Sequence, residues 1–446
     1  MNIEAALGDD GFPADRLLIS GNATGTTTVN VINQGGTGAD TGTLSTDGAS
    51  IVQVGGSSTA DAFWLAGGYV AVGPYRYELN AFAPGASAGG ELDPRLAAVG
   101  TTQFWDYRLQ SVLDGGAPVP VPQVPGYQAL TPAVLQYGWA SLDNLHSRLG
   151  EIHYLGHMRE SCVEDCVASP PGEGTETFFR ARGWSGEFDG DRGPDFDQDL
   201  WFVQTGINAV GWDIRETGDS LRFGLAFTYG QSDVTVPVAG GRETDLKFRT
   251  PALALISTYQ AADGWYVDTI LQGSHYNTDV STTERGEVAD FDGAGLGASI
   301  EAGYPILVGP WLIFEPQAQL AYQRMWFDDF TDADGIAVDY QDTDGLQGRI
   351  GGRLQRTFVG RSSDRMLSPF VNVDVLQGFI NDGSLTASGV GFHTDTNSTA
   401  MQFGGGVNGQ FGKRWALYAS GNYIHGLDDG GLDHAWTGTG GIRFNF

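Results

Sequence analysis

Few side chains in this sequence have a type and spacing that suggest chemistry. Cys162 and Cys166 are the only two cysteines, and they lie four residues apart in SCVEDC. In an exported protein such a pair forms a small disulfide loop, because oxidising compartments preserve disulfides. A metal site would need further ligands nearby, and none is evident around these cysteines. We therefore expect a disulfide between them, and no metal site or cofactor in the chain.

Three segments resemble enzyme motifs, but none of them has the residues or the context that the motif requires. The run GGGVNG, residues 404–409, has the letters of a dinucleotide fingerprint, but it lies in a strand pattern with no helix after it. Ser185 in GWSGE is not a nucleophile elbow, because Glu187 replaces the required glycine. The adjacent Asp433 and His434 suggest the Asp/His pair of a barrel protease, but a solvated loop is the simpler interpretation. We expect no catalytic residue and no enzymatic activity.

Composition excludes several classes of protein. The chain has 446 residues and a net charge of −30, whereas a nucleic-acid binder needs a basic face. Aromatic residues reach 11%, which indicates a folded chain rather than a disordered one. No hydrophobic stretch approaches the roughly 18 residues of a spanning helix. The first residues, MNIEAALGDDGF, lack the basic and apolar parts of a signal peptide, so export requires a signal that the printed sequence does not contain.

From about residue 177 to residue 446 the sequence alternates with a period of two. In LRFGLAFTYG, starting at Leu221, large apolar residues lie on one face, and glycine and small or polar residues lie on the other. Long and short connections alternate between such segments. Twelve segments begin near Phe178, Leu200, Leu221, Phe248, Trp265, Phe291, Trp311, Leu346, Arg365, Ser398, Trp415 and His434. Their ends carry Trp201, Trp265, Trp311, Trp326, Trp415 and Trp436, as in interfacial girdles. This pattern predicts an all-β fold with a 12-stranded antiparallel transmembrane β-barrel; a soluble β-sandwich is the alternative.

The barrel interior is expected to be polar, and one helix is expected before the first barrel strand. Strand parity directs Arg222, Asp268, Glu301, Glu315, Arg349, Arg353, Asp374 and Arg443 into the lumen. For each of these, simple solvation is the alternative to a specific partner. Residues 131–157 have apolar residues at helical spacing, with Thr131 as N-cap and Pro132 in the first turn. A barrel of twelve strands lies between a filled one of eight and an open one of sixteen, so its lumen has room for one amphipathic helix.

The remaining segments complete the domain prediction. Residues 1–114 are rich in glycine and threonine with short β runs, and they are expected to form a β region separate from the barrel. The segment GGAPVPVPQVPGY predicts an extended linker over residues 115–130. Residues 158–176 form a second linker with the cysteine pair, and residues 177–446 form the barrel. The final residues place Ile442, Phe444 and Phe446 on one strand face.

In this order the segments resemble a classical autotransporter of type V secretion. The segments ADRLLISGNATGTTTVNVINQGG and FWLAGGYVAVGPYRYELNAF resemble the pertactin-type end of a passenger β-helix with its autochaperone cap. SLDNLHSRLGEI resembles the segment that threads the pore, and DQDLWFVQTGIN with the later strands resembles the translocator barrel. GIRFNF resembles the barrel-assembly signal of outer-membrane proteins, with Phe446, Phe444 and Ile442 as its apolar positions.

The resemblance implies a bacterial outer-membrane translocator that exports an N-terminal passenger and displays it at the cell surface. The implied partners are outer-membrane lipid, the barrel-assembly machinery, periplasmic chaperones and the chain's own passenger, with no nucleic acid. A surface adhesin barrel that binds host or neighbouring cells is the alternative function. An outer-membrane protease ranks third.

One further site follows from the resemblance. Some autotransporters cleave themselves in the pore helix between two adjacent asparagines, where the first side chain attacks its own backbone carbonyl. Aligning on Leu145, Arg148 and Gly150 puts Asp143 and Asn144 at this candidate passenger cleavage site. Because the carboxylate of Asp143 cyclises less readily than an amide, we expect no self-cleavage; cleavage by another protease stays open.

Overall fold

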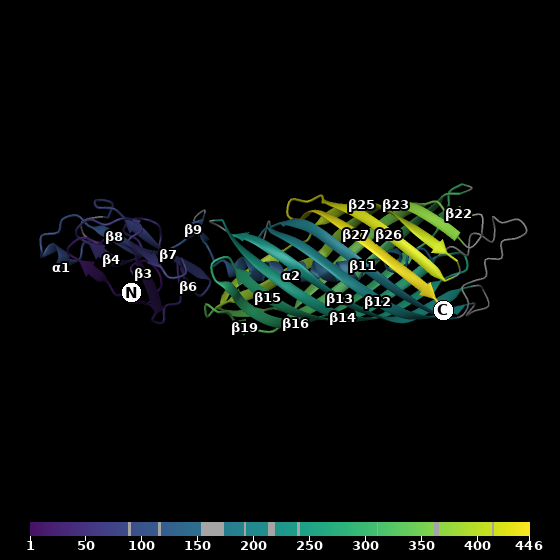
Figure 1. The fold of residues 1–446 in the computed structure, drawn as a ribbon, viewed down its shortest axis with the longest axis horizontal. Coiled ribbons are helices and arrows are strands. Elements are labelled where there is room, and N and C mark those ends of the chain that lie inside the picture. Colours follow the sequence, from purple (N-terminus) through teal and green to yellow (C-terminus); the bar gives the residue numbers. More distant parts are fainter. Residues whose placement is uncertain are drawn as a thin grey trace, which may run out of the picture.

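The computed structural model describes the chain except for residues 88–90, 115–116, 153–173, 191–192, 213–218, 239–240, 310, 361–364 and 413. Cys162 and Cys166, with most of the predicted linker 158–176, lie outside the described residues. A small β region and a barrel follow one another along the long axis of the molecule, and the helix α2 lies within the barrel (Figure 1). Among the described residues, no helix has both the length and the apolar character to span a membrane.

The N-terminal region is a stack of short strands with its own core. Its elements are β1 (Asn2–Ala5), β2 (Leu17–Ile19), β3 (Thr27–Asn33), β4 (Ala49–Val54), β5 (Phe63–Leu65), β6 (Val70–Val72), β7 (Tyr75–Phe82), α1 (Pro94–Ala97), β8 (Trp105–Ser111), β9 (Leu113–Asp114) and β10 (Ala117–Pro118). The parallel pairs β1–β3, β3–β5 and β2–β4 stack like the rungs of a β-helix. The pair β2–β4 belongs to a second sheet, which β8 extends by pairing antiparallel with both β4 and β7. Val29, Ile51 and Tyr107 are fully buried in this core.

The barrel consists of twelve long antiparallel strands and is closed. They are β11 (Gly174–Asp189), β12 (Phe196–Trp212), β13 (Ser220–Val238), β14 (Arg242–Gln260), β15 (Tyr266–Thr282), β16 (Gly286–Gly303), β18 (Ile313–Phe327), β21 (Thr343–Gln355), β23 (Arg365–Ala387), β25 (Thr399–Phe411), β26 (Trp415–Gly426) and β27 (Gly431–Asn445). Short strands extend the hairpins: β17 (Ile306–Leu307), β19 (Phe330–Thr331), β20 (Ala337–Tyr340), β22 (Phe358–Val359) and β24 (Val390–Asp395). The first strand, β11, pairs with the last, β27, from Glu176↔Asn445 onward. The predicted 12-stranded barrel is confirmed.

Side-chain alternation explains why these segments form a membrane barrel. On β13 the outward residues Leu221, Phe223, Leu225, Phe227 and Tyr229 are 37–56% exposed, as expected for side chains that contact lipid. Further along, the outward face becomes polar: Lys247 pairs with Asp233 at 2.9 Å, and Arg249 pairs with Asp279 at 2.8 Å. The strands therefore continue as a polar wall past the apolar band. The strand β14 accordingly begins at Arg242 and not near Phe248. Residues 242–247, expected to belong to a connection, are part of the strand.

The two ends of the barrel are distinct. We call the end beside the N-terminal region the cap mouth and the end that carries the C terminus the far mouth (Figure 1). Strand direction puts Trp201, Trp326 and Trp436 towards the cap mouth and Trp265, Trp311 and Trp415 towards the far mouth. All six are exposed on the outer surface, at 38–62%. They form two aromatic levels, which is the arrangement that marks the interfaces of a membrane.

Two helices occupy the barrel interior, with bounds that differ from the prediction. α2 spans Gln123–Ser141 and α3 spans Leu145–Leu149. The predicted helix over 131–157 with an N-cap at Thr131 is wrong, as is an extended linker up to residue 130. Pro125 lies in the first turn, where no intrahelical donor is lost, and Pro132 is accommodated inside the helix. The predicted amphipathic face is also absent, because 16 of the 19 residues of α2 are buried.

The occupied barrel lumen as candidate functional site

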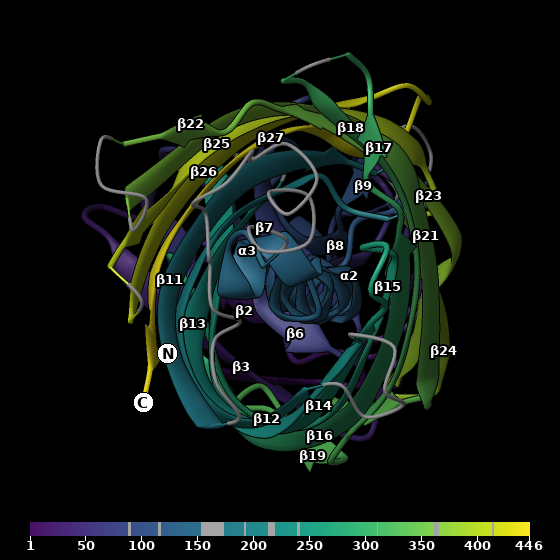
Figure 2. The same ribbon diagram turned by 90° about the vertical axis from the view of Figure 1, so that its right-hand side faces the viewer.

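The functional geometry of this molecule lies in its lumen. Looking along the barrel axis, α2 and α3 fill the centre of the ring of strands (Figure 2). They come from a segment that precedes every barrel strand in the sequence, so the chain passes through its own barrel. The barrel wall therefore surrounds α2 and α3, a segment of the same polypeptide.

Inward-facing glycines shape the wall around α2. A Cβ atom at Gly383 would lie 2.6 Å from Thr131 Cγ2, and one at Gly297 would lie 3.0 Å from Leu142 Cδ1. A Cβ at Gly345 would overlap the side chain of Leu135. Each glycine thus leaves a recess that a helix side chain occupies. This close fit gives a structural reason for inward glycine in strands, where it otherwise weakens pairing.

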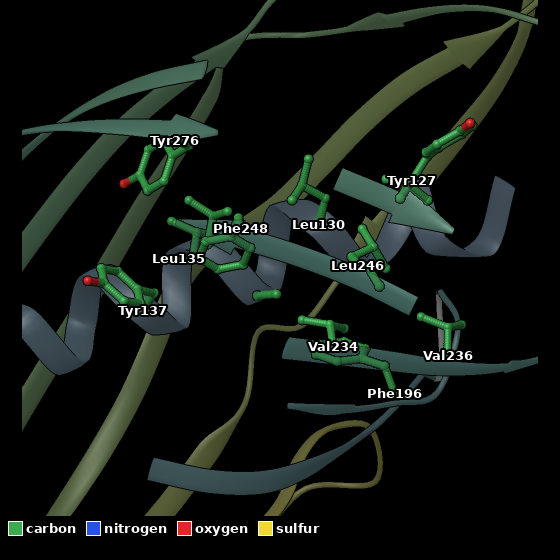
Figure 3. Packing of buried hydrophobic residues seen from close by; sticks show 14 of the residues in the cluster. Tyr127, Leu130, Leu135, Tyr137, Phe196, Val234, Val236, Leu246, Phe248 and Tyr276 are labelled. Atoms are coloured by element: carbon green, nitrogen blue, oxygen red, sulfur yellow. The ribbon is translucent and has the colours of Figure 1, made fainter. Parts of the chain in front are cut away.

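Apolar and aromatic side chains pack around α2 in the half of the lumen nearest the cap mouth. The ring of Tyr137 meets those of Phe202 and Phe248 edge to face, at centroid distances of 6.1 and 5.8 Å. Leu130 and Leu135 belong to the same cluster, and the wall residues labelled in Figure 3 come from β12, β13, β14 and β15. Other barrel strands also contribute, for example through Phe291 on β16 and Leu385 on β23. This part of the wall is apolar where the prediction assumed a polar lumen throughout.

Polar wall residues contact α2 mainly through its backbone. Their side chains donate to main-chain carbonyls at Pro122 (Thr244, 2.6 Å), Tyr127 (Tyr340, 2.9 Å), Ala133 (Gln198, 2.8 Å), Leu135 (Gln323, 2.9 Å), Ser141 (Arg180, 2.8 Å) and Leu142 (Gln319, 2.8 Å). A carbonyl oxygen has two lone pairs, so a carbonyl inside the helix can accept such a bond in addition to its intrahelical one. The carbonyls of Ser141 and Leu142 lie at the C-terminal end of α2 and have no intrahelical donor, so the wall side chains satisfy them instead. Gly138 allows Gln323 to lie flat on the helix, because a Cβ there would overlap the Gln323 amide.

The contacts of α3 are different, because they join charged side chains. Arg148 donates to Asp268 at 2.7 Å, and both are almost fully buried. His146 Nε2 lies 2.7 Å from a carboxylate oxygen of Glu315. Just past α3, Glu151 pairs with Arg353 at 3.1 Å. The helix segment is thereby fixed in register, because each pair requires one particular residue at one height.

The eight charges assigned to the lumen by strand parity are all buried, at 5% exposure or less. Asp268, Glu315 and Arg353 contact the α3 segment directly, and Glu301 accepts from the Leu145 backbone N–H at 3.0 Å. Arg349 joins the wall carboxylates Glu301 and Asp374, at 3.5 and 3.1 Å. The last two, Arg222 and Arg443, lie near Glu176, at 3.4 and 4.0 Å. Arg443 also donates to the Glu151 carbonyl at 3.1 Å.

Sequence reasoning missed Arg180 and Arg182 on β11. Both share the inward parity of that strand, so alternation around Phe179 was the signal that could have found them. Arg182 forms an ion pair with Asp143, the first residue of the candidate cleavage site. Asn144, the second, caps α3 by accepting from the Ser147 N–H at 2.8 Å. The candidate cleavage site therefore lies in the short break between the two helices.

A second polar cluster closes the cap mouth. Gln123 on α2 donates to Asp332 at 3.1 Å and to Asp334 at 2.9 Å, both in the connection between β19 and β20. Arg285 forms an ion pair with Asp334 and lies over the ring of Tyr69, 4.3 Å from its centroid. Burial raises the pKa of the Asp332 carboxyl above its ordinary value. Helix, barrel rim and N-terminal region are joined at this point.

The predicted assembly signal lies at the far mouth. Phe446 is 72% exposed, and its ring contacts that of Phe444 at a centroid distance of 4.9 Å. Phe444 in turn packs on Trp415 at 4.5 Å. Ile442 is half-buried on the same strand, β27. The terminal aromatic is therefore accessible at the barrel end.

Comparisons with known sequences agree with this geometry. The model of the autotransporter beta-domain matches residues 177–422, and that of the Autochaperone Domain Type 1 matches residues 1–79. The adhesin BmaC autotransporter of Brucella suis is 27% identical over 465 residues, covering 99% of this chain and 13% of that protein. The pertactin autotransporter of Bordetella bronchiseptica is 26% identical over 269 residues, covering 58% of this chain and 28% of that protein. The chain thus spans less than a third of either relative.

Solved structures show the same fold. The β domain of the Bordetella autotransporter BrkA superposes with a TM-score of 0.51 at 22% identity, covering 61% of this chain and all of that one. The transport unit of the Escherichia coli autotransporter AIDA-I gives a TM-score of 0.51 at 15% identity, covering 65% and 96%. Because the family model covers more than half of the sequence, the chain belongs to the autotransporter family, and its barrel is the family's outer-membrane translocator domain.

Proposed function

We propose that this chain carries its own N-terminal portion across the outer membrane and then keeps it attached at the cell surface, with α2 and α3 as a permanent plug. The observation that supports this most strongly is the path of the chain. It enters at the cap mouth as α2, continues as α3 inside the lumen, and β11 begins at the far mouth. On this proposal the cap mouth is extracellular and the far mouth is periplasmic.

The N-terminal region gives the transport a direction. It has a hydrophobic core of its own, and residues 1–79 match the autochaperone model. Folding of this region outside the membrane would prevent the chain from sliding back, because a folded domain cannot re-enter a filled barrel. The proposal needs no catalytic residue in this chain, and we infer that the chain is not an enzyme.

We also propose that the chain remains uncleaved between Asp143 and Asn144. The Asp143 carboxylate is held by Arg182 and also accepts from the Asn144 backbone N–H at 2.7 Å. The Asn144 side chain is engaged in capping α3. A cyclising attack by either side chain would have to break these contacts first.

Labelling intact cells tests both parts of the proposal. The full chain is expressed behind an export signal, with one epitope before residue 10 and a second inserted between β25 and β26, whose facing ends lie at the far mouth. We expect the first epitope to be accessible to antibody and protease on intact cells, and both epitopes to remain on one polypeptide. An inaccessible N-terminal epitope would contradict display, and separation of the epitopes at residues 143–144 would contradict the uncleaved state.

We infer that Phe446 is read by the barrel-assembly machinery, with periplasmic chaperones as earlier partners. Its ring is largely exposed, so deleting it should cost only about 1.5–3 kcal/mol of burial at most. The truncated chain should refold in detergent like the parent but assemble poorly in cells and be degraded. Equal assembly in cells would show that Phe446 is only a packing residue.

Adhesion is a second candidate function. It is favoured by the relative that matches 99% of this chain, which is named an adhesin. The attached N-terminal region would then present an adhesive passenger rather than release it. Binding of host cells by bacteria that display residues 1–446, compared with bacteria that display the chain without residues 1–114, tests whether the N-terminal region contributes.

A further inference from the structure

A row of metal-ligand side chains crosses the seam where the barrel closes. His425 on β26 lies directly opposite His434 on β27, and His434 lies directly opposite Glu187 on β11. Glu187 in turn lies opposite Asp197 on β12. Directly opposed residues on one sheet face have Cβ atoms about 4.5–5.5 Å apart. Four neighbouring strands thus present two imidazoles and two carboxylates in one row across the sheet.

A β-bulge adds a fifth group to this row. The register shifts after Glu187, so that Phe188 pairs with Leu432 and leaves Asp433 as the extra residue. Asp433 Oδ2 lies 2.9 Å from His434 Nδ1, and Glu187 Oε2 lies 3.7 Å from the same nitrogen. The ligand atoms of these three residues all lie within 4.8 Å of one another. Small side-chain rotations would bring them to one ion, because zinc lies about 2.0–2.2 Å from its nitrogen and oxygen ligands.

The row is accessible from outside the barrel, above the level of the lipid. The side chains of Glu187, Asp433 and His434 are 56%, 43% and 33% exposed. Trp436, two residues along the same outer face of β27, packs on Tyr423 at a centroid distance of 4.7 Å. This aromatic pair belongs to the level near the cap mouth, so the row lies just beyond it in polar surroundings. An ion could therefore reach the site from the aqueous side.

The local charge also calls for a cation. Glu187 and Asp197 are like charges directly opposite each other on one face, an arrangement that destabilises a sheet. Asp433 adds a third carboxylate beside them. Imidazole together with carboxylate is a ligand set suited to a first-row transition metal such as zinc, rather than to calcium or magnesium, which prefer oxygen alone.

We propose that His434, Glu187 and Asp433, with His425 as an additional ligand, form a binding site for a zinc-type dication that clamps the first barrel strand to the last. The site is independent of transport, because none of these residues faces the lumen. Metal bound there joins β26, β27 and β11 across the one junction that connects the two ends of the barrel sequence. A metal ion that binds the closed barrel but not the unfolded chain stabilises the closed barrel by mass action.

The test uses the untagged full chain refolded in detergent and titrated with zinc chloride against a fluorescent chelator. We expect one saturable site per chain, with affinity at least tenfold lower in His434→Ala and also reduced in His425→Ala and Glu187→Gln. His393→Ala, which removes an exposed histidine elsewhere on the barrel, should bind like the parent. Zinc should also raise the temperature at which the closed form opens in heat-modifiability gels, in the parent and in His393→Ala but not in His434→Ala.

Each variant is first shown to form the same closed barrel without metal. Absence of a saturable site in the parent would overturn the proposal, as would unchanged affinity in His434→Ala. A parallel titration with calcium chloride checks the ligand class. An increase of the opening temperature by calcium as large as that by zinc, in the parent and also in His434→Ala, would show that carboxylates alone bind the ion. That result would overturn the assignment of the imidazoles as ligands.

Discussion

The two helices in the lumen are held in different ways. α2 fits glycine recesses and an aromatic cluster, and the polar contacts reach its backbone carbonyls. α3 is held by ion pairs such as Arg148–Asp268, between side chains that are almost fully buried. Shape and burial therefore fix the position of α2, whereas charge fixes the register of α3. The plug combines a tightly packed segment near the cap mouth with a register-specific segment deeper in the barrel.

This difference has a consequence for sequence tolerance. A contact to a backbone carbonyl survives a change of side chain, but a buried ion pair fails when one partner is removed. Loss of a wall donor to a carbonyl inside α2 also costs little, because that carbonyl keeps its intrahelical hydrogen bond. Removing a charged partner of α3 should therefore be more damaging than removing such a wall donor. The following changes test that ranking, starting with the largest expected effect.

Arg148→Met should have the largest effect. It leaves the buried Asp268 carboxylate without its cation, and breaking a buried pair in this way costs about 3–5 kcal/mol. Hydrogen exchange of the α3 amides should rise accordingly in the refolded protein. The control is Arg148→Met with Asp268→Asn, which removes both charges and should recover most of the protection. If the single variant exchanged as slowly as the parent, the ion pair would not be what holds α3.

Gly383→Val should disturb α2 by about 1–3 kcal/mol, the usual cost of overpacking. Its new Cβ would meet the stiff, β-branched side chain of Thr131. The expected result is transient channel opening in planar bilayers, because α2 can no longer seat fully. Gly183→Val is the matched control, since its Cβ would point into open space on the outer face. Equal conductance traces for Gly383→Val and Gly183→Val would contradict the conclusion that Gly383 forms a recess for Thr131.

Asn144→Ala should cost about 1 kcal/mol, because it removes the N-cap of α3. Exchange should increase at the first amides of α3 and not in α2, whose N-terminus has no side-chain cap. A uniform increase through both helices would mean that the two segments behave as one unit.

Gln323→Met should have the smallest effect, about 0.5 kcal/mol, at the low end of what a typical hydrogen bond contributes. The substitution removes the donor to the Leu135 carbonyl, but that carbonyl keeps its intrahelical bond. Denaturant unfolding in detergent measures the change, with Gln231→Met, at an outward position on β13, as control. A loss as large as that of Arg148→Met would reverse the proposed ranking.

Much of the barrel was predictable, because lipid imposes a strict period of two on each strand. The apolar series on β13 and the inward parity of Asp268 and Arg353 follow from that period alone. Strand ends were less predictable. Beyond the apolar band the outward residues become polar, so β14 resembles a loop up to Phe248 although its hydrogen bonds begin at Arg242.

The lumen helix was the least predictable element. Local sequence favours an extended chain around Pro122 and Pro125, yet the segment is helical because the barrel buries it on all sides. The donors Gln198 and Gln323 gave no signal, since glutamine in a strand is equally suited to solvent. Glycine recesses such as Gly383 are likewise invisible until the facing helix residue is known. Tertiary packing, not local propensity, determines these features.

Ion conductance of a chain that lacks residues 123–149 tests the central claim most directly, namely that α2 and α3 seal the barrel. The deletion variant is first shown to be closed by its heat-modifiable migration, which a barrel without free edges should retain. In planar bilayers we expect steady openings of much larger conductance than those of the parent, because α2 and α3 occupy the centre of the ring of strands (Figure 2). A folded deletion variant with the conductance of the parent would contradict the plug and place these helices outside the permeation path.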